Sequence, residues 1–207
     1  MMQPNEDFGK LPEASVVNEL VKVLNGKGIN AFYMQTGAEA KEKVLEIVPQ
    51  DAEVFTASST TLQTIGLVEE VEQGSRYISL KNKLAAMDSE SQAKEKRQLA
   101  AAPDWVMGSI HAVTKAGEFL IASNTGSQLP LYASGASNVV WVIGTQKIVE
   151  NVEQGMKRLY EYCLPLENER ALKAYGMPSA VNKILMINKE IKPGRINVVF
   201  VNEKVGF

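Results

Sequence analysis

The chain has 207 residues, of which 45% are hydrophobic and 22% are charged, a composition typical of a globular protein long enough to bury its own core. Its formal net charge of −2 implies no basic face, so nucleic-acid binding is not expected. No apolar run is long enough to cross a membrane and the N-terminus carries no signal-peptide pattern, so we expect a cytoplasmic protein without membrane contact.

The single cysteine limits metal and redox chemistry. Cys163 cannot form an internal disulfide, and it cannot by itself supply a zinc or iron–sulfur site built from cysteines. The apolar residues around it follow a helical spacing, so we expect a packed thiol. The chain offers no metal or cluster ligands at a suitable spacing, and its sequence leaves the question of a cofactor open.

The first half of the chain alternates between helix and strand patterns. Residues 1–10 are expected to form a flexible tail, and residues 11–207 a single domain. In chain order, the patterns predict a helix over 11–25, a strand over 29–35, a helix opened by a capping box at Thr36 and ended before Pro49, a strand over 52–57, a helix opened by Thr60 and Gln63, a short strand over 76–80, and a helix opened by a capping box at 89–92 that runs to 102.

The second half contains the strongest strand pattern, over 138–143, where a continuous apolar run is typical of a strand buried on both faces. The other patterns predict a strand over 104–113, alone or followed by a short helix, a strand over 118–122, a long helix from Lys147 to Leu164-Pro165, and strands over 183–188 and 196–202. The short connection through Pro193-Gly194 predicts that the last two strands form an antiparallel hairpin.

The alternation of strands and helices predicts an α/β fold. We expect three layers, with helices on both faces of a mixed, mostly parallel sheet, and the C-terminal antiparallel hairpin as its antiparallel part. In such folds, ligands bind beyond the carboxyl ends of the strands. The strand ends are therefore the place to look for functional side chains.

Two hydroxyl-rich stretches follow predicted strands. The first could bind an anion or simply cap the next helix; it consists of Ser58, Ser59, Thr60 and Thr61. The second could be a polar turn, but we favour ligand binding because loops at strand ends often carry function; it consists of Ser123, Asn124, Thr125, Gly126, Ser127 and Gln128. We expect the two stretches to converge on one cleft that binds an anionic small molecule.

Two residues are candidates for catalysis. His111, the only histidine, could act as a general acid or base because its ordinary pKa lies near neutrality, or it could be a hydrogen-bonded histidine beside a packed segment. Glu118 follows Gly117 at the start of a predicted strand, where a carboxylate could serve as nucleophile or base, or could simply be solvated. The glycine-rich dinucleotide motif, the Walker A motif and the nucleophile-elbow motif are missing.

Four segments carry a resemblance to a known family. They are Phe55–Leu62, Ala116–Ile121, Val139–Val149 and the ending from Asn182 to Glu203. Their order and spacing resemble the LUD domain, a lactate-utilisation family with a NagB/RpiA/CoA-transferase-like fold, over about Leu11 to Phe207. Many members read Glu-Thr-Gly-Thr where this chain has Lys115-Ala116-Gly117-Glu118, and an arginine often found in the family is replaced around 126–128.

The resemblance implies a role in L-lactate utilisation or a related small organic-acid pathway, either beside a separate iron–sulfur subunit or as a stand-alone relative. The resemblance is compatible with two functions. One is an enzyme or binding domain for a hydroxy acid, an oxo acid, a sugar phosphate or a CoA derivative. The other is a non-catalytic subunit that binds the iron–sulfur partner. The sequence does not decide whether the chain is an enzyme or whether it forms a homodimer.

Overall fold

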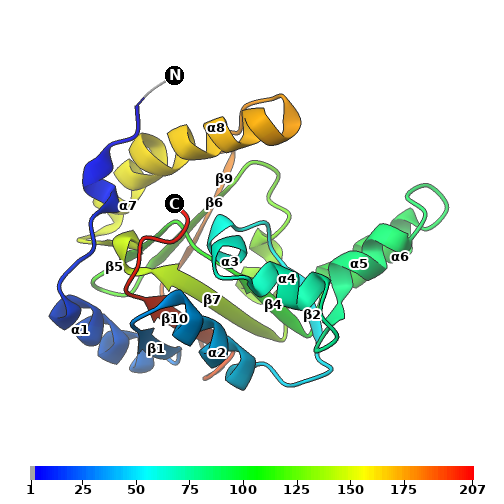
Figure 1. Cartoon of the computed structure of the whole chain (residues 1–207), viewed down its shortest axis with the longest axis horizontal. Helices are drawn as coiled ribbons and strands as arrows, with labels where there is room; N and C mark the ends of the chain where they lie inside the picture. The colour runs from blue at the N-terminus through cyan, green and yellow to red at the C-terminus, as the bar shows by residue number, and fades with distance from the viewer. Residues whose placement is uncertain (1–2) are drawn as a thin grey trace.

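The computed structural model describes residues 3–207 and contains two sheets (Figure 1). All neighbouring strands of the six-stranded sheet run parallel, in the order β1 (Asn30–Met34), β10 (Ile196–Val201), β7 (Asn138–Gly144), β4 (Trp105–Gly108), β2 (Glu53–Thr56) and β3 (Ile78–Ser79). The smaller, mixed sheet has the order β8 (Ile148–Val149), β5 (Ala112–Thr114), β6 (Phe119–Ser123) and β9 (Lys183–Ile187). The predicted α/β class with a mostly parallel main sheet is confirmed.

Helices and helical turns connect the strands. The helices are α1 (Ala14–Asn25), α2 (Gly37–Ile47), α3 (Thr60–Thr64), α4 (Leu67–Glu72), α5 (Leu80–Ala86), α6 (Ala93–Ala101), α7 (Val152–Arg158) and α8 (Leu164–Tyr175). The turns are η1 (Glu6–Gly9), η2 (Leu131–Gly135), η3 (Thr145–Lys147) and η4 (Leu159–Cys163). Figure 1 shows α5 and α6 projecting from the body as an arm, and α6 has no buried residue. In residues 3–207, no helix is both long and apolar enough to cross a membrane.

The central strands bury both of their faces, as the run at 138–143 predicts. In β7, Val139, Trp141 and Ile143 point to a core shared with α1 and the smaller sheet. Val140 and Val142 point to the opposite core, which α2, α3 and α4 cover. The outer face of the smaller sheet is covered in turn by α7 and η4. One face of the main sheet is therefore covered by a helix and a second sheet together.

Residues 3–10 pack against the C-terminal half of the chain. The amide of Asn5 donates to the carbonyl oxygen of Glu161 at 2.9 Å, and its side chain donates to the Glu161 carboxylate at 3.0 Å. Phe8 contacts the core beneath α7. The predicted tail covers this segment together with Met1 and Met2, which lie outside the described residues.

The predicted C-terminal hairpin is wrong. β10 is completely buried and lies between β1 and β7 in the main sheet, with parallel pairing on both sides. β9 pairs antiparallel with β6 in the smaller sheet. The connection through Pro193-Gly194 packs on the turn after α1, where the Gly194 amide donates to the Gly28 carbonyl at 3.0 Å. A strand buried on both faces is stabilised more by two neighbours in the main sheet than by one at an edge.

The predicted helix from Lys147 to Leu164-Pro165 is also wrong at both ends. Ile148 and Val149 pair with β5, and α7 begins later, where the Asn151 side chain accepts a hydrogen bond from the Gln154 amide at 3.0 Å. At the other end the helical path continues through η4, a π-helical segment, into α8. Pro165 has no amide to donate to the carbonyl of Glu161 four residues earlier, and that carbonyl accepts instead from the Asn5 amide at 2.9 Å.

Two helix starts differ from the predicted capping boxes. Ser59, rather than Thr60, caps α3 by accepting from the Leu62 amide at 3.3 Å. At 89–92 the Asp88 carboxylate organises a turn by accepting from the Ser91 amide at 2.7 Å, so α6 begins only at Ala93. Both helices begin at a different residue than predicted, because a neighbouring side chain accepts hydrogen bonds from the free backbone amides.

Candidate functional site

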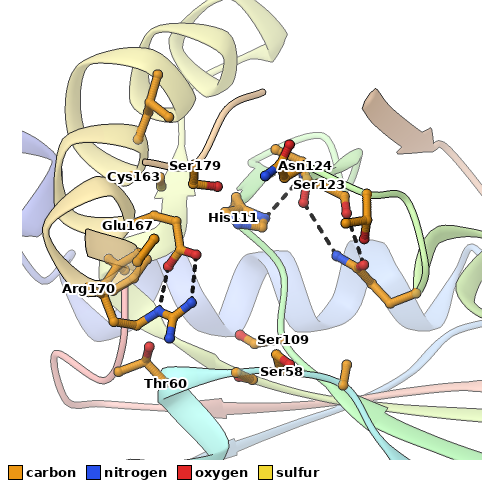
Figure 2. Close-up of a pocket in the computed structure, with 18 of the residues that line it drawn as sticks. Ser58, Thr60, Ser109, His111, Ser123, Asn124, Cys163, Glu167, Arg170 and Ser179 are labelled. Atoms are coloured by element: carbon orange, nitrogen blue, oxygen red, sulfur yellow. Dashed lines mark hydrogen bonds and ion pairs between the residues drawn. The ribbon is translucent and has the colours of Figure 1, made fainter. Parts of the chain in front are cut away.

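A cavity of about 530 Å³ lies beyond the carboxyl ends of β2 and β6. Its floor comes from the segment after β2 and from residues 109–111 between β4 and β5. Its walls come from the loop after β6, from η4 and α8, and from the segment 177–181 that leads to β9. Figure 2 shows these segments facing one another around His111. The volume is typical of a small-molecule site.

The structure brings together most of the predicted site residues. Those that line the cavity are Ser58, Ser59, Thr60, Thr61, His111, Ser123, Asn124, Thr125, Ser127 and Gln128. The two hydroxyl-rich stretches thus share one cavity although their strands belong to different sheets. Ser59 and Ser123 also stabilise their own loops: Ser59 caps α3, and the Ser123 hydroxyl accepts from the Gly126 amide at 2.8 Å.

Three predicted residues lie elsewhere, which corrects their assignment to the site. Gly117 and Glu118 form the turn between β5 and β6, and the Glu118 carboxylate accepts a hydrogen bond from the Thr114 hydroxyl. This turn precedes β6, whereas the site loop follows it, so the two lie at opposite ends of the strand. Gly126 adopts a positive φ of 87° beside Lys183 and lines a second cavity, next to β9.

Lys147 lies at the cavity, although no sequence pattern predicted a role for it. Its side chain is 1% exposed, and its Nζ donates to the hydroxyls of Thr61 and Ser109, both at 3.0 Å, and to the carbonyl of Ile110 at 3.1 Å. The two hydroxyls donate onward to carbonyl oxygens. When Lys147 is protonated, these bonds use all three ammonium hydrogens, so the position of its Nζ is fixed.

The charge of Lys147 has no carboxylate partner among residues 3–207, since its three acceptors are neutral. Burial, together with the nearby charge of Arg158, lowers the pKa of Lys147 to about 7. A lysine directly after a doubly buried parallel strand is the signal that could have identified it, because ligands bind at that end of the sheet.

Arg158 is a second buried cation behind the cavity wall. It is 0% exposed, and its Nη1 donates to the carbonyl of His111 and, at 2.9 Å, to Sγ of Cys163. Its Nε and Nη2 have no hydrogen-bond partner within residues 3–207. By contrast, the buried Arg195 donates to backbone carbonyls and to the Glu190 carboxylate at 2.8 Å. Nothing in the apolar helical spacing around Arg158 indicates its role.

Cys163 is packed, as its helical spacing predicts, but it also lines the cavity. Burial raises the pKa of its thiol, and the neighbouring Arg158 and Lys147 only partly oppose this. The thiol is therefore protonated near neutral pH, which argues against an activated nucleophile.

His111 lines the cavity in a form unsuited to proton transfer at neutral pH. Its pKa is lowered to about 3 by burial and by the charges of Lys147 and Arg158. General acid–base catalysis is efficient when the pKa lies near the working pH, so the predicted acid–base role is not supported by the site's electrostatics.

The far wall of the cavity carries its acidic side chain. Glu167 on α8 accepts two hydrogen bonds from Arg170, at 2.7 and 2.8 Å, and Figure 2 shows this pair facing the cavity. The segment after α8 is held by the amide of Ser179, which donates to the Asn168 side chain at 2.8 Å. Because Glu167 is already paired, the unbalanced charge at the cavity is positive.

Comparisons with known proteins agree with this architecture. The model of the LUD domain matches residues 17–201. A crystal structure of a DUF162 family protein from Deinococcus radiodurans has a similar fold, with a TM-score of 0.56 and 10% sequence identity over 93% of this chain and 100% of that chain. No curated protein matches the chain in sequence. The match over most of the chain shows that the protein belongs to the LUD domain family.

Proposed function

We propose that the cavity binds a small organic anion and that Lys147 neutralises its charge. The observation that carries this proposal is the ammonium of Lys147, which is 1% exposed, lines the cavity and has only neutral acceptors. Burying an unpaired charge costs several kcal/mol, so a bound anion would remove a standing electrostatic cost.

Arg158 strengthens the same argument. Its guanidinium lies behind His111 and Cys163 and also lacks a carboxylate, so two buried positive charges act on this end of the cavity. The nearby acidic group, Glu167, is paired with Arg170. Because water screens charges less in a buried region, these two charges attract a bound anion over longer distances than surface charges would.

The polar lining can orient an anion without adding charge. Ser58 lies in the segment after β2 and Thr60 at the start of α3, while Asn124 and Thr125 lie in the loop after β6. Their hydroxyl and amide groups are neutral hydrogen-bond donors. The lining thus combines a lysine that is charged when an anion lies beside it with neutral donors, which suits a carboxylate or a phosphate.

Membership of a family named for lactate utilisation favours an organic acid as the ligand. We therefore place the protein in L-lactate utilisation or a related organic-acid pathway. The cavity of about 530 Å³ has room for acids larger than lactate. Its Phe55 and Tyr175 side chains offer apolar surface for such a larger part.

Isothermal titration calorimetry tests the proposal. The panel contains L-lactate, pyruvate, phenyllactate, phenylpyruvate, ribose 5-phosphate and CoA, titrated into the wild type, Lys147→Met and Lys115→Met. Lys115 is the matched control because it lies outside the cavity in a half-exposed ion pair with Glu150 at 2.5 Å. We expect at least one ligand to bind the wild type and the control alike, and to bind Lys147→Met at least ~10-fold more weakly, about 1.4 kcal/mol. Equal binding by all three proteins would overturn the proposal.

A second candidate function is binding of an iron–sulfur partner at β9. This strand is at the edge of the smaller sheet and exposes Ile184 and Met186, and the connection after it exposes Ile191. Exposed strand edges with apolar side chains are ready to pair with another chain. Co-purification of a protein with iron–sulfur absorbance, lost in Met186→Lys and kept in Lys147→Met, would support this function over the first.

A further inference from the structure

The imidazole of His111 is held rigidly by β6. The His111 amide donates to the carbonyl of Leu120 at 3.1 Å, and its Nδ1 accepts from the amide of Ala122 at 3.2 Å. The His111 carbonyl accepts from Arg158. Backbone and ring are thus fixed by neighbours on either side, so the ring direction is set before any ligand arrives.

These contacts determine where the ring proton lies. Because Nδ1 uses its lone pair to accept the Ala122 amide, the proton of the neutral ring lies on Nε2. Nε2 makes no hydrogen bond with residues 3–207 and is not among their buried unpartnered atoms. Figure 2 shows the ring in the cavity, between Ser179 and the loop of Ser123 and Asn124.

The cations beside His111 keep the ring neutral. Lys147 donates to the carbonyl of Ile110, the preceding residue, and Arg158 donates to the carbonyl of His111 itself. Another positive charge on the ring would be repelled by both. The cavity therefore presents a neutral N–H group near Lys147, whose Nζ is held in one position.

We infer that His111 is a specificity residue which donates a hydrogen bond from Nε2 to an oxygen placed beside the acid group of the ligand. The inference rests on the proposed function and narrows it to acids with an oxo or hydroxyl oxygen next to the carboxylate. An amino acid would place its ammonium, which can only donate hydrogen bonds, against the Nε2–H donor. Lys147 and Arg158 would also repel that positive charge, so the site should reject amino acids. A site built for one hydrogen-bonding pattern discriminates strongly against ligands that leave its groups unpaired.

Two measurements test the inference. Because His111 is the only histidine, a 15N–1H spectrum of the imidazole ring reports on this residue alone. We expect the Nε2–H tautomer in the free protein, and a shift of the Nε2 resonance when an oxo or hydroxy acid is added. The Nδ1–H tautomer, or a bound acid that leaves Nε2 unmoved, would overturn the inference.

Calorimetry with two matched triples supplies the second measurement: pyruvate, L-lactate and L-alanine, and phenylpyruvate, L-phenyllactate and L-phenylalanine. We expect the amino acid of the binding triple to bind at least ~10-fold more weakly than its partners. His111→Asn can still accept from Ala122 but cannot reach the ligand, so it should bind the oxo and hydroxy acids more weakly and lose part of this preference, since Lys147 and Arg158 remain. His111→Gln, which can place an N–H near the Nε2 position, should recover part of the loss.

The outcomes separate the two proposals. Binding that depends on Lys147 but does not distinguish the three acids, or is unchanged in His111→Asn, overturns the role of His111 and leaves the anion site standing. If no acid of either triple binds and the other anions also fail, the proposed function is wrong and the inference falls with it.

Discussion

Replacing Lys147 by methionine should stabilise the free protein near neutral pH. The pKa of this lysine falls from 10.5 to about 7 in the folded state. This fall in pKa corresponds to about 5 kcal/mol of unfolding free energy that is lost when the ammonium is buried. Methionine removes this cost but leaves the Ile110 carbonyl without its donor, which costs about 1–3 kcal/mol. We therefore expect Lys147→Met to be roughly 2–4 kcal/mol more stable than the wild type at pH 6.

The pH dependence of this difference in stability shows whether it comes from removing a buried charge or from better packing of methionine. Because the folded pKa is lower than the unfolded one, the unfolded chain binds more protons between about pH 7 and pH 10.5. The wild type should thus gain about 2 kcal/mol relative to Lys147→Met between pH 7 and pH 9.

Guanidinium unfolding of the wild type, Lys147→Met and Lys115→Met at pH 6, 7, 8 and 9 measures both effects. Lys115→Met should follow the wild type at every pH, since its ammonium is half exposed. A Lys147→Met protein that is less stable than the wild type at pH 6, with a gap that stays constant as the pH rises, would refute the reasoning.

Three further predictions concern other residues. Glu118→Gln should bind the ligand as the wild type does, because this carboxylate lies outside the cavity; a 10-fold loss in calorimetry would return it to the site. Cys163 should react slowly with iodoacetamide in the native protein at pH 7 and rapidly once unfolded, because burial raises the pKa of its thiol; equal rates by mass spectrometry would contradict this. Since the pKa of His111 falls from 6.5 to about 3, the wild type should lose about 2 kcal/mol of stability relative to His111→Asn between pH 7 and pH 5, and a constant difference in unfolding free energy would show that the ring is not held neutral.

The parts of the fold that depend on local pattern were predictable. The apolar run at 138–143 predicts a strand buried on both faces, and β7 has this form. Sheet order was not predictable in the same way, because the length of a connection does not determine which strands will be the neighbours of the next one. The strand after Pro193-Gly194 inserts between β1 and β7 because its two apolar faces need burial on both sides.

In the site, too, the residues that depend on local pattern were predictable and those that depend on the path of the chain were not. Hydroxyl groups at strand ends indicated part of the cavity floor, after β2, and one wall, after β6, since ligands in α/β folds bind beyond the carboxyl ends of strands. Lys147 was missed because Ile148 and Val149 continue an apolar helical spacing, and only pairing with β5 turns them into a strand. Arg158 and the α8 wall depend on the path of the chain through η4, for which the sequence around Leu164-Pro165 predicts an end.

Proton uptake on ligand binding tests most directly whether Lys147 neutralises the charge of the bound anion. At pH 8, a lysine with a pKa of about 7 is mostly neutral, and an anion bound beside it should restore its proton. Calorimetry of the tightest-binding acid at pH 8, in two buffers with different ionisation enthalpies, should show an uptake of about one proton for the wild type and none for Lys147→Met. Binding without proton uptake by the wild type would show that the anion does not depend on the charge of Lys147.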